Sequence, residues 1–366
     1  MNAFLNLSAP GIGELKPYIP GKPLSELERE LGISHSIKLA SNENPLGASP
    51  KVGEAIMRAL PEIARYPDGG GFALRQALSI HHAIDPACIT LGNGSNDVLD
   101  MVARVFLAPG TQSLFSQYAF AVYPICSQAV GAELVVAPAS AYGHDLQAMH
   151  ERITANTRVI WIANPNNPTG TWLRKDALYD FIRELPTKII LVLDEAYTEY
   201  VGEEAYPDGS QWLKEFPNLV VIRTFSKAYG LASLRVGYAL SHPDIADLLN
   251  RVRQPFNVNS LAQVAALAAL QDQSFIKRAV ELNRQGMRQL IQGVEALGLS
   301  YIPSAGNFIT VDMGRDASPL DQALLKSGCI TRPLANYGMP NHLRFTIGHE
   351  AENARLLESL KMVLAA

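Results

Sequence analysis

The chain has 366 residues, of which 48% are hydrophobic and 18% are charged. This composition is sufficient for a large core and excludes an intrinsically disordered chain, and the length allows about two or three domains. The formal net charge is 31 − 35 = −4 and there is no run of Lys or Arg, so we expect no nucleic-acid partner. No apolar stretch reaches the ~18–20 residues that span a bilayer, so we expect no membrane segment.

The N-terminal segment and the cysteines favour the cytoplasm as the compartment of the protein. Residues 1–21 lack a basic start, a long apolar run and a small-residue cleavage site, so we expect no signal peptide. The cysteines are Cys88, Cys126 and Cys329, which are widely spaced and have no CxxC pattern. They favour a reducing compartment over a disulfide framework or a zinc site. We therefore expect a cytoplasmic protein without a bound metal.

Short runs rich in β-branched and apolar residues recur along the first part of the chain. They lie at 89–91, 113–115, 134–137, 159–163, 189–193, 220–224 and 236–240. Apolar residues with helical spacing at 98–106 and 178–185 separate some of them, and 159–163 and 189–193 are apolar throughout. The alternation predicts an α/β domain with a mostly parallel seven-stranded sheet, whose ligand site lies at the carboxyl ends of the strands.

The pattern changes after residue 260. Residues 260–298 have mainly helical spacing, and they are followed by strands near 307–311, 330–333 and 343–347 and helices near 320–326 and 351–365. This order predicts a smaller α+β domain. We therefore expect three parts: an N-terminal arm at 1–43 that joins the small domain or a partner subunit, a large domain at 44–259, and a small domain at 260–366.

Polar residues follow several of the predicted strands. Small residues at 92–97, Gly-Asn-Gly-Ser-Asn-Asp, precede a helix and suit an anion, although Ser95 or Asn96 alone would also cap that helix. The segment 164–170 is either a simple turn or a loop that brings Asn167 to the site. Asp194 directly follows a buried strand, where a carboxylate is costly unless a cation or donor meets it. A helix cap or a surface position is the alternative for this residue alone.

Lys227 lies in an apolar setting after the run at 220–224. A lysine in such surroundings has a lowered pKa and can act as an amine nucleophile, although a surface lysine is the alternative for this residue alone. Arg235 follows eight positions later. An amine, a carboxylate and an anion pocket at one edge of a sheet together suit pyridoxal phosphate, which a lysine holds as a Schiff base.

These segments resemble the fold-type I pyridoxal-phosphate aminotransferases, and most closely the histidinol-phosphate aminotransferases. The resemblance extends over nearly the whole chain, through KLASNENPLG (38–47), RYPDG (65–69), LGNGSND (91–97), ANPNNPTG (163–170), LDEAYTEY (193–200), RTFSKAYGLASLRVGY (223–238) and HLRFTIG (342–348). The segments NPTG, DEAY and SKxxGLAxxRxG are specific to the superfamily, and NENP and RYPD favour the histidinol-phosphate branch.

The resemblance implies a catalytic role for Lys227, Asp194 and Tyr197. Lys227 would form the Schiff base and move the proton, Asp194 would pair with the pyridine nitrogen, and Asn167 and Tyr197 would bond the ring oxygen. The implied cofactor-binding set is Gly94, Ser95, Asn96, Phe120, Asn167, Asp194, Tyr197, Thr224, Ser226, Lys227, Arg235 and, from the neighbouring subunit of a homodimer, Tyr66. Many relatives have Tyr on the ring face; here Phe120 is the expected residue and Tyr118 the alternative.

The resemblance also implies a substrate and a co-substrate. Arg332 and Arg344 with Tyr18 would bind the phosphate of histidinol phosphate by charge-assisted bonds, and the same arginines would bind 2-oxoglutarate. Asn44 and Asn167 complete the expected substrate-binding set, and a surface ion pair is the alternative for Arg332. The implied activity is a transamination in histidine biosynthesis that gives imidazole acetol phosphate and glutamate.

Other activities compatible with the same residues remain open. An aromatic amino-acid aminotransferase and a threonine-phosphate decarboxylase share the fold and the cofactor. A non-catalytic pyridoxal-binding regulator has no support, because no DNA-binding segment is attached. A dinucleotide enzyme is disfavoured because no third glycine follows Gly92 and Gly94 at the required spacing.

Overall fold

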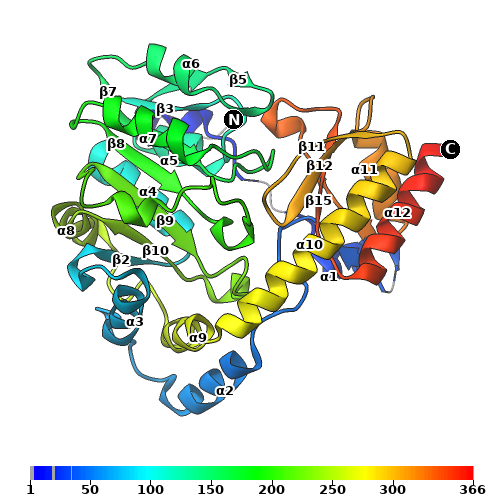
Figure 1. Ribbon diagram of the computed structural model, residues 1–366, viewed down its shortest axis with the longest axis horizontal. Helices are drawn as coiled ribbons and strands as arrows, with labels where there is room; N and C mark the ends of the chain where they lie inside the picture. Colours follow the sequence, from blue (N-terminus) through cyan, green and yellow to red (C-terminus); the bar gives the residue numbers. More distant parts are fainter. Residues whose placement is uncertain (1–3, 19–20, 34, 366) are drawn as a thin grey trace.

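The computed structural model describes residues 4–18, 21–33 and 35–365, which form two main sheets of unequal size covered by helices, together with two short two-stranded sheets (Figure 1). The larger sheet has seven strands in the order β2-β10-β9-β8-β7-β3-β4. Strand β10 is antiparallel to both of its neighbours, and the other pairs are parallel. The strands are β2 (Ile89–Gly92), β3 (Gln112–Ser116), β4 (Glu133–Ala137), β7 (Thr157–Ala163), β8 (Ile190–Asp194), β9 (Leu219–Thr224) and β10 (Gly237–Ser241).

The central strands are apolar because both faces of the large sheet are covered. Along β7, Val159 and Trp161 belong to one core cluster, whereas Ile160 and Ile162 belong to another on the opposite face. Helices α4 (Ser95–Phe106), α5 (Val122–Ala129) and α8 (Pro243–Val252) pack against the first face. The second face packs against α3 (Phe72–His82), α6 (Leu146–Glu151), α7 (Lys175–Glu184) and α9 (Ser260–Leu270).

The smaller sheet has four antiparallel strands in the order β11-β12-β15-β14. They are β11 (Ser300–Ile302), β12 (Phe308–Asp312), β14 (Arg332–Pro333) and β15 (His342–Thr346). Helices α10 (Gln273–Ala296), α11 (Ser318–Lys326) and α12 (Glu350–Ala365) cover this sheet, and α10 runs from α9 across to it in Figure 1. The amino-terminal part adds α1 (Leu24–Leu31) and α2 (Pro50–Ala59).

The predicted fold class is confirmed, and each of the seven β-rich runs forms a strand of the large sheet. The run near 330–333 differs from the prediction, because it is divided at Thr331 into two short strands. Strand β13 (Cys329–Ile330) pairs in parallel with β1 (Ile37–Lys38), whereas β14 pairs with β15. The amino-terminal segment also contacts the small sheet, because the Thr346 backbone N–H on β15 donates to the Leu39 carbonyl oxygen at 2.8 Å. The domain boundaries at 43 and 259 stay predictions.

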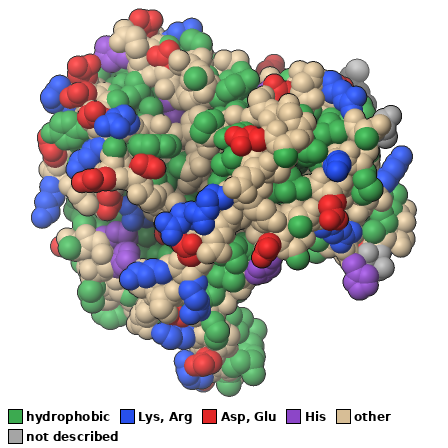
Figure 2. All heavy atoms as spheres, turned by 45° about the vertical axis from the view of Figure 1, so that its right-hand side comes forward, with side chains coloured by type: hydrophobic (Ala, Val, Ile, Leu, Met, Phe, Trp, Pro, Cys, Tyr) green, Lys and Arg blue, Asp and Glu red, His purple; other side chains and the backbone are tan. Residues whose placement is uncertain are grey.

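Among the described residues, no helix is both long enough and apolar enough to cross a bilayer. Acidic and basic side chains are interspersed on the face shown in Figure 2. Within these ranges no group of three His, Cys, Asp or Glu side chains is arranged to hold a metal ion.

Candidate functional site

A cavity lies between the carboxyl ends of the large sheet's central strands and the small sheet. Residues at the ends of β7, β8 and β9 form one side, and β14 and β15 contribute the other. Its lining residues are Tyr18, Gly21, Ala40, Ser41, Asn42, Ser95, Asn96, Phe120, Ala163, Pro165, Asn167, Asp194, Ala196, Tyr197, Thr224, Ser226, Lys227, Arg235, Arg332 and Arg344.

One end of the cavity combines a helix N-terminus with an arginine. Ser95 begins α4, so the unpaired N–H groups of its first turn face this end and favour an anion. Arg235 Nη1 donates to Ser226 Oγ at 3.3 Å. Gly94 has φ of +80°, and a Cβ there would lie only 2.4 Å from Arg235 Nη2, so only glycine lets the loop approach the guanidinium.

Lys227 lies in the middle of the cavity lining, and its Nζ donates to the carbonyl oxygen of Ser41 at 3.1 Å. Burial and the positive charges of Arg344 and Arg235 together lower the pKa of Lys227 to about 7, against the opposing attraction of Glu43 and Asp194. The amine is therefore uncharged in a large fraction of molecules at neutral pH, as a nucleophile requires.

Asp194 ends β8 and lines the cavity next to the buried ring of Tyr123. The Tyr123 hydroxyl donates to its Oδ2 at 2.9 Å and the Ala196 backbone N–H donates to its Oδ1 at 3.2 Å. Burial raises the pKa of Asp194 to about 6, while these two donors and Lys227 favour the ionised form. Tyr123 is itself held by stacking on Trp161, with ring centroids 5.2 Å apart. A carboxylate fixed in this way suits a ligand that presents a cationic N–H group.

Two amide side chains hold the hydroxyl of Tyr197. Asn42 Nδ2 and Asn167 Nδ2 lie 2.9 and 3.2 Å from Tyr197 Oη. Arg344 donates to Asn167 Oδ1 and, at 2.7 Å, to the carbonyl oxygen of Ala40. The phenol, the amide and the guanidinium therefore form one connected network that links the large sheet to β15.

The cavity contains more positive charge than its carboxylates balance. Arg332 and Arg344 are each less than 10% exposed, and Arg332 lies over the Tyr18 ring at 5.5 Å. Within the described ranges, Arg235, Arg332 and Arg344 form no ion pair. Because a buried cation without a counterion is costly, the arrangement suits a ligand with at least one anionic group.

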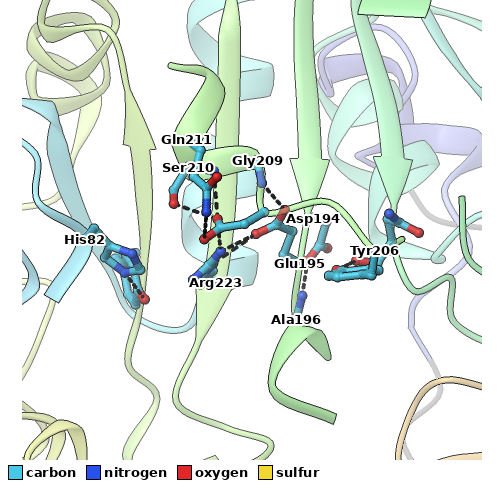
Figure 3. A network of polar contacts seen from close by, with 12 residues as sticks. His82, Asp194, Glu195, Ala196, Tyr206, Gly209, Ser210, Gln211 and Arg223 are labelled. Atoms are coloured by element: carbon cyan, nitrogen blue, oxygen red, sulfur yellow. Dashed lines mark hydrogen bonds and ion pairs between the residues drawn. The ribbon is translucent and has the colours of Figure 1, made fainter. Parts of the chain in front are cut away.

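A separate ion-pair network holds the backbone on the other side of β8 (Figure 3). Arg223 donates to Glu195 Oε2 through Nε at 3.0 Å and through Nη2 at 2.7 Å, and to Asp208 Oδ1 at 2.6 Å. The Gly209 backbone N–H donates to Glu195 Oε1 at 2.8 Å. Consecutive residues on a strand point to opposite faces, so Glu195 fixes the strand end from which Asp194 faces the cavity.

Comparison with known proteins identifies the family. The family model described as "Aminotransferase class I and II" matches residues 34–360. The chain belongs to this aminotransferase family. A relative in Pseudomonas fluorescens (strain Pf0-1), "Histidinol-phosphate aminotransferase 2", is 59% identical over 364 residues, which cover 99% of this chain and 98% of the relative. The predicted resemblance to histidinol-phosphate aminotransferases is therefore confirmed.

Solved structures agree with the aminotransferase fold. The crystal structure of histidinol-phosphate aminotransferase from Sinorhizobium meliloti, in complex with pyridoxal-5'-phosphate, has a TM-score of 0.90 and 30% identity and covers 97% of each chain. An L-threonine-O-3-phosphate decarboxylase from Porphyromonas gingivalis has a TM-score of 0.80 over 90% of this chain and all of that chain, but its 24% identity shows the fold alone.

Most of the residues expected in the aminotransferase site line the cavity together, but three do not. Gly94 is next to the lining residue Ser95, and a Cβ at this position would meet the Arg235 guanidinium. Asn44 is buried and donates to the Ala228 carbonyl oxygen at 2.8 Å. Tyr66 is 82% exposed and stacks on Phe256. The functional roles of these three residues, and of the predicted residues that line the cavity, stay predictions.

The two candidates for the ring face occupy different positions. Phe120 lines the cavity and contacts Tyr123 edge to face. Tyr118 packs instead on Tyr142, with ring centroids 5.5 Å apart, next to a small apolar cluster that contains Met339. This position favours Phe120 as the stacking residue.

The sequence-based interpretation assigned no role to Asn42, Ser41 or Tyr123. Asn42 and Ser41 lie within the KLASNENPLG segment, and Tyr123 lies three positions after Phe120. Their signal was therefore present, but their partners Tyr197, Lys227 and Asp194 are more than 70 positions away. Only the folded chain shows these contacts.

The lowered pKa of Lys227 predicts a pH-dependent reactivity. Reductive methylation with formaldehyde should label Lys227 at pH 7 at least ~10 times faster than an ordinary lysine with pKa near 10.4. Because the pKa is about 7, labelling should fall about tenfold per pH unit below pH 6 and level off above about pH 8. Mass spectrometry of peptides from protein labelled between pH 5 and 9 measures this. A rate at Lys227 that still rises steeply at pH 9 would contradict the lowered pKa.

Proposed function

We propose that the chain catalyses pyridoxal-phosphate-dependent transamination of L-histidinol phosphate with 2-oxoglutarate, giving imidazole acetol phosphate and glutamate in histidine biosynthesis. The cavity itself supports this most directly. It combines an amine that is largely uncharged at neutral pH, a fixed carboxylate, and two sets of arginines that have no ion-pair partner among the described residues. One group, at Arg235, suits the cofactor's phosphate, and the other, at Arg332 and Arg344, suits an anionic substrate. The names of the relatives agree with this substrate.

The residues present fit pyridoxal phosphate. The N-terminus of α4, Ser226 and Arg235 provide donors for a phosphate, and Gly94 lets the loop adopt its positive φ next to the guanidinium. Asp194 provides an acceptor for the ring nitrogen and Lys227 provides the amine. When bound, the cofactor supplies a pyridinium ring that withdraws electrons from the substrate's Cα.

The side chains of the chain then have separate tasks. Lys227 Nζ, with its pKa near 7, accepts the Cα proton of the substrate and donates it in the next step. Asp194, ionised at neutral pH and fixed by Tyr123, keeps the ring nitrogen protonated. Tyr197 and Asn167 orient the ring through its oxygen.

The second group of cations selects the substrate. Arg332 and Arg344, with Tyr18 at the rim, bind the dianionic phosphate of histidinol phosphate by charge-assisted hydrogen bonds. The same guanidinium groups bind a carboxylate of 2-oxoglutarate when that molecule follows. Asn44 donates to the carbonyl oxygen of Ala228, the residue after Lys227, so its proposed role is to hold the backbone next to the reactive amine.

The proposed reaction predicts a strict substrate and co-substrate requirement. The kcat/KM for histidinol phosphate should exceed that for phenylalanine by about 10–100-fold, because charged hydrogen bonds to a phosphate contribute roughly 1.5–3 kcal/mol. Turnover should require 2-oxoglutarate, and Lys227→Ala should lower kcat by at least about 10³-fold. A coupled assay for glutamate measures all three, with Lys214→Ala as the matched surface control.

The same assay separates the alternatives. A higher kcat/KM for phenylalanine would indicate an aromatic amino-acid aminotransferase. Release of carbon dioxide from threonine phosphate without a keto acid would indicate a decarboxylase. Either result would contradict the proposed substrate while leaving the family assignment intact.

We also infer a cytoplasmic homodimer with shared active sites. Large apolar side chains are exposed on and after α2, among them Met57, Ile63 and Tyr66, which are 67%, 62% and 82% exposed. Phe72 at the start of α3 is 68% exposed as well. Hydrophobic atoms are visible on the lobe at the bottom of Figure 2, where α2 lies. A second copy that covers this surface would bring its Tyr66 hydroxyl to the phosphate end of the cavity.

Mixing two inactive variants tests the shared site. Lys227→Ala and Tyr66→Ala subunits should each have low activity, because each lacks one part of every site. In a mixed dimer, the site with an intact Lys227 would receive Tyr66 from its partner. Random mixing should therefore restore about a quarter of wild-type sites, which activity after co-refolding measures. No gain in activity above the separate variants would contradict the shared site, and a monomer by sedimentation would contradict the dimer.

A further inference from the structure

Asn42 joins three parts of the molecule at one point. Its side-chain Nδ2 donates to Tyr197 Oη at 2.9 Å, behind the end of β8. Its backbone N–H donates to Thr346 Oγ1 on β15 at 2.9 Å, and its carbonyl oxygen accepts from Asn307 Nδ2 at 2.9 Å, next to β12. Asn42 is 1% exposed, so water does not compete for these bonds.

The orientation of the Asn42 amide is fixed by Thr346. The Thr346 hydroxyl accepts the Asn42 backbone N–H and donates its own hydrogen to Asn42 Oδ1 at 3.2 Å. The amide oxygen therefore faces Thr346, which leaves Nδ2, with its two hydrogens, facing Tyr197. On the other side of the phenol, Arg344 has only donors and must face Asn167 Oδ1, so Asn167 also presents Nδ2 to Tyr197.

The hydroxyl hydrogen of Tyr197 then has one direction left. Burial raises the pKa of Tyr197, so its hydrogen is retained at neutral pH. Two amide donors occupy the acceptor positions of the phenol oxygen, and the hydrogen is directed away from both, toward the cavity that the residue lines. Tyr197 is thus held as a hydrogen-bond donor to whatever acceptor occupies the cavity.

We propose that Asn42 is a positioning residue that holds Tyr197 as a donor toward the bound cofactor, and that Thr346 on β15 sets this orientation. The proposal rests on the proposed function, because the acceptor in the cavity is the ring oxygen of pyridoxal phosphate. Thr346 and Arg344 lie two positions apart on β15 and face the same side of the small sheet. The strand that binds the substrate anion therefore also fixes both amides that hold Tyr197.

The backbone conformation of Asn42 limits which substitutions can test its positioning role. Asn42 has φ of +56°, a left-handed conformation that Asn, Asp and Gly tolerate and most residues do not. Asn42→Asp keeps the shape of the side chain but replaces the donor by a carboxylate, which would accept the Tyr197 hydrogen and turn it away from the cavity. Asn42→Gly removes the donor without reversing the hydrogen bond.

Asn42→Asp adds a carboxylate beside Tyr197, whereas all of these variants keep the existing ionisable groups around it. These groups are Asp194 on β8, Lys227 with Nζ 5.7 Å from the Tyr197 ring centroid, Arg344 on β15, and Tyr337 after β14. A hydrogen bond to an anionic ring oxygen stabilises the deprotonated chromophore. Loss of the Tyr197 donor should therefore raise the pH at which the bound cofactor's visible absorption band changes.

The experiment measures cofactor binding and the spectral pH titration of purified variants. For Asn42→Asp we expect the dissociation constant for pyridoxal phosphate to increase about tenfold and the spectral midpoint to rise by about one pH unit. For Asn42→Gly we expect a smaller shift in the same direction. Thr346→Val should also raise the spectral midpoint. Thr346→Ser keeps the hydroxyl, so its midpoint should equal that of the wild type.

The outcomes separate this inference from the proposed function. If the wild-type protein bound no pyridoxal phosphate, the proposed function would fail. If the wild type titrated normally and Asn42→Asp matched it within about 0.2 pH unit and twofold in affinity, only the role of Asn42 would be refuted. Equal losses of melting temperature in Asn42→Asp and Asn42→Gly with no spectral shift would likewise leave a merely structural role. If Asn42→Asp did not fold, the variants Thr346→Val and Thr346→Ser would test the proposal instead. A spectral midpoint in Thr346→Val equal to that of the wild type would then overturn it.

Discussion

Desolvation of the Lys227 amine beside two guanidinium groups is the interaction on which the rest of the site depends. Burial alone disfavours the charged form, and Arg344 and Arg235 add repulsion, so the pKa decreases to about 7. The same cations lack carboxylate partners within the described ranges, and Asp194 is the acid that faces them from β8. An anionic ligand therefore stabilises the cavity, and the free amine is available to react with it.

The fold makes this arrangement possible by using both faces of one strand end. Asp194 and Glu195 are adjacent, yet one faces the cavity and the other forms ion pairs with Arg223 on the opposite face. The buried ion pair does not by itself indicate high stability, because desolvation offsets much of its attraction. Its effect is geometric: it holds the backbone from which Asp194 and Tyr197 project, so the reactive groups lie on a rigid element.

The strength of the sequence signal differed between local and distant features. The strands at 157–163 and 190–194 were predictable because a run that is covered on both faces must be apolar throughout. Asp194, Asn167 and Lys227 were predictable because each follows such a strand, and strand ends meet at one edge of the sheet. Asn42 and Tyr123 were missed because their significance comes from partners far along the chain. The division of 329–333 into β13 and β14 likewise depends on which distant strand is adjacent to each half.

The most direct test of the account is the site of covalent attachment. The purified protein is incubated with pyridoxal phosphate, reduced with borohydride, digested with trypsin and mapped by mass spectrometry. A modified Lys227 resists trypsin, so the account predicts a labelled peptide that extends from Thr224 to Arg235. A label on another lysine, or no label at all, would contradict the central role of the Lys227 amine.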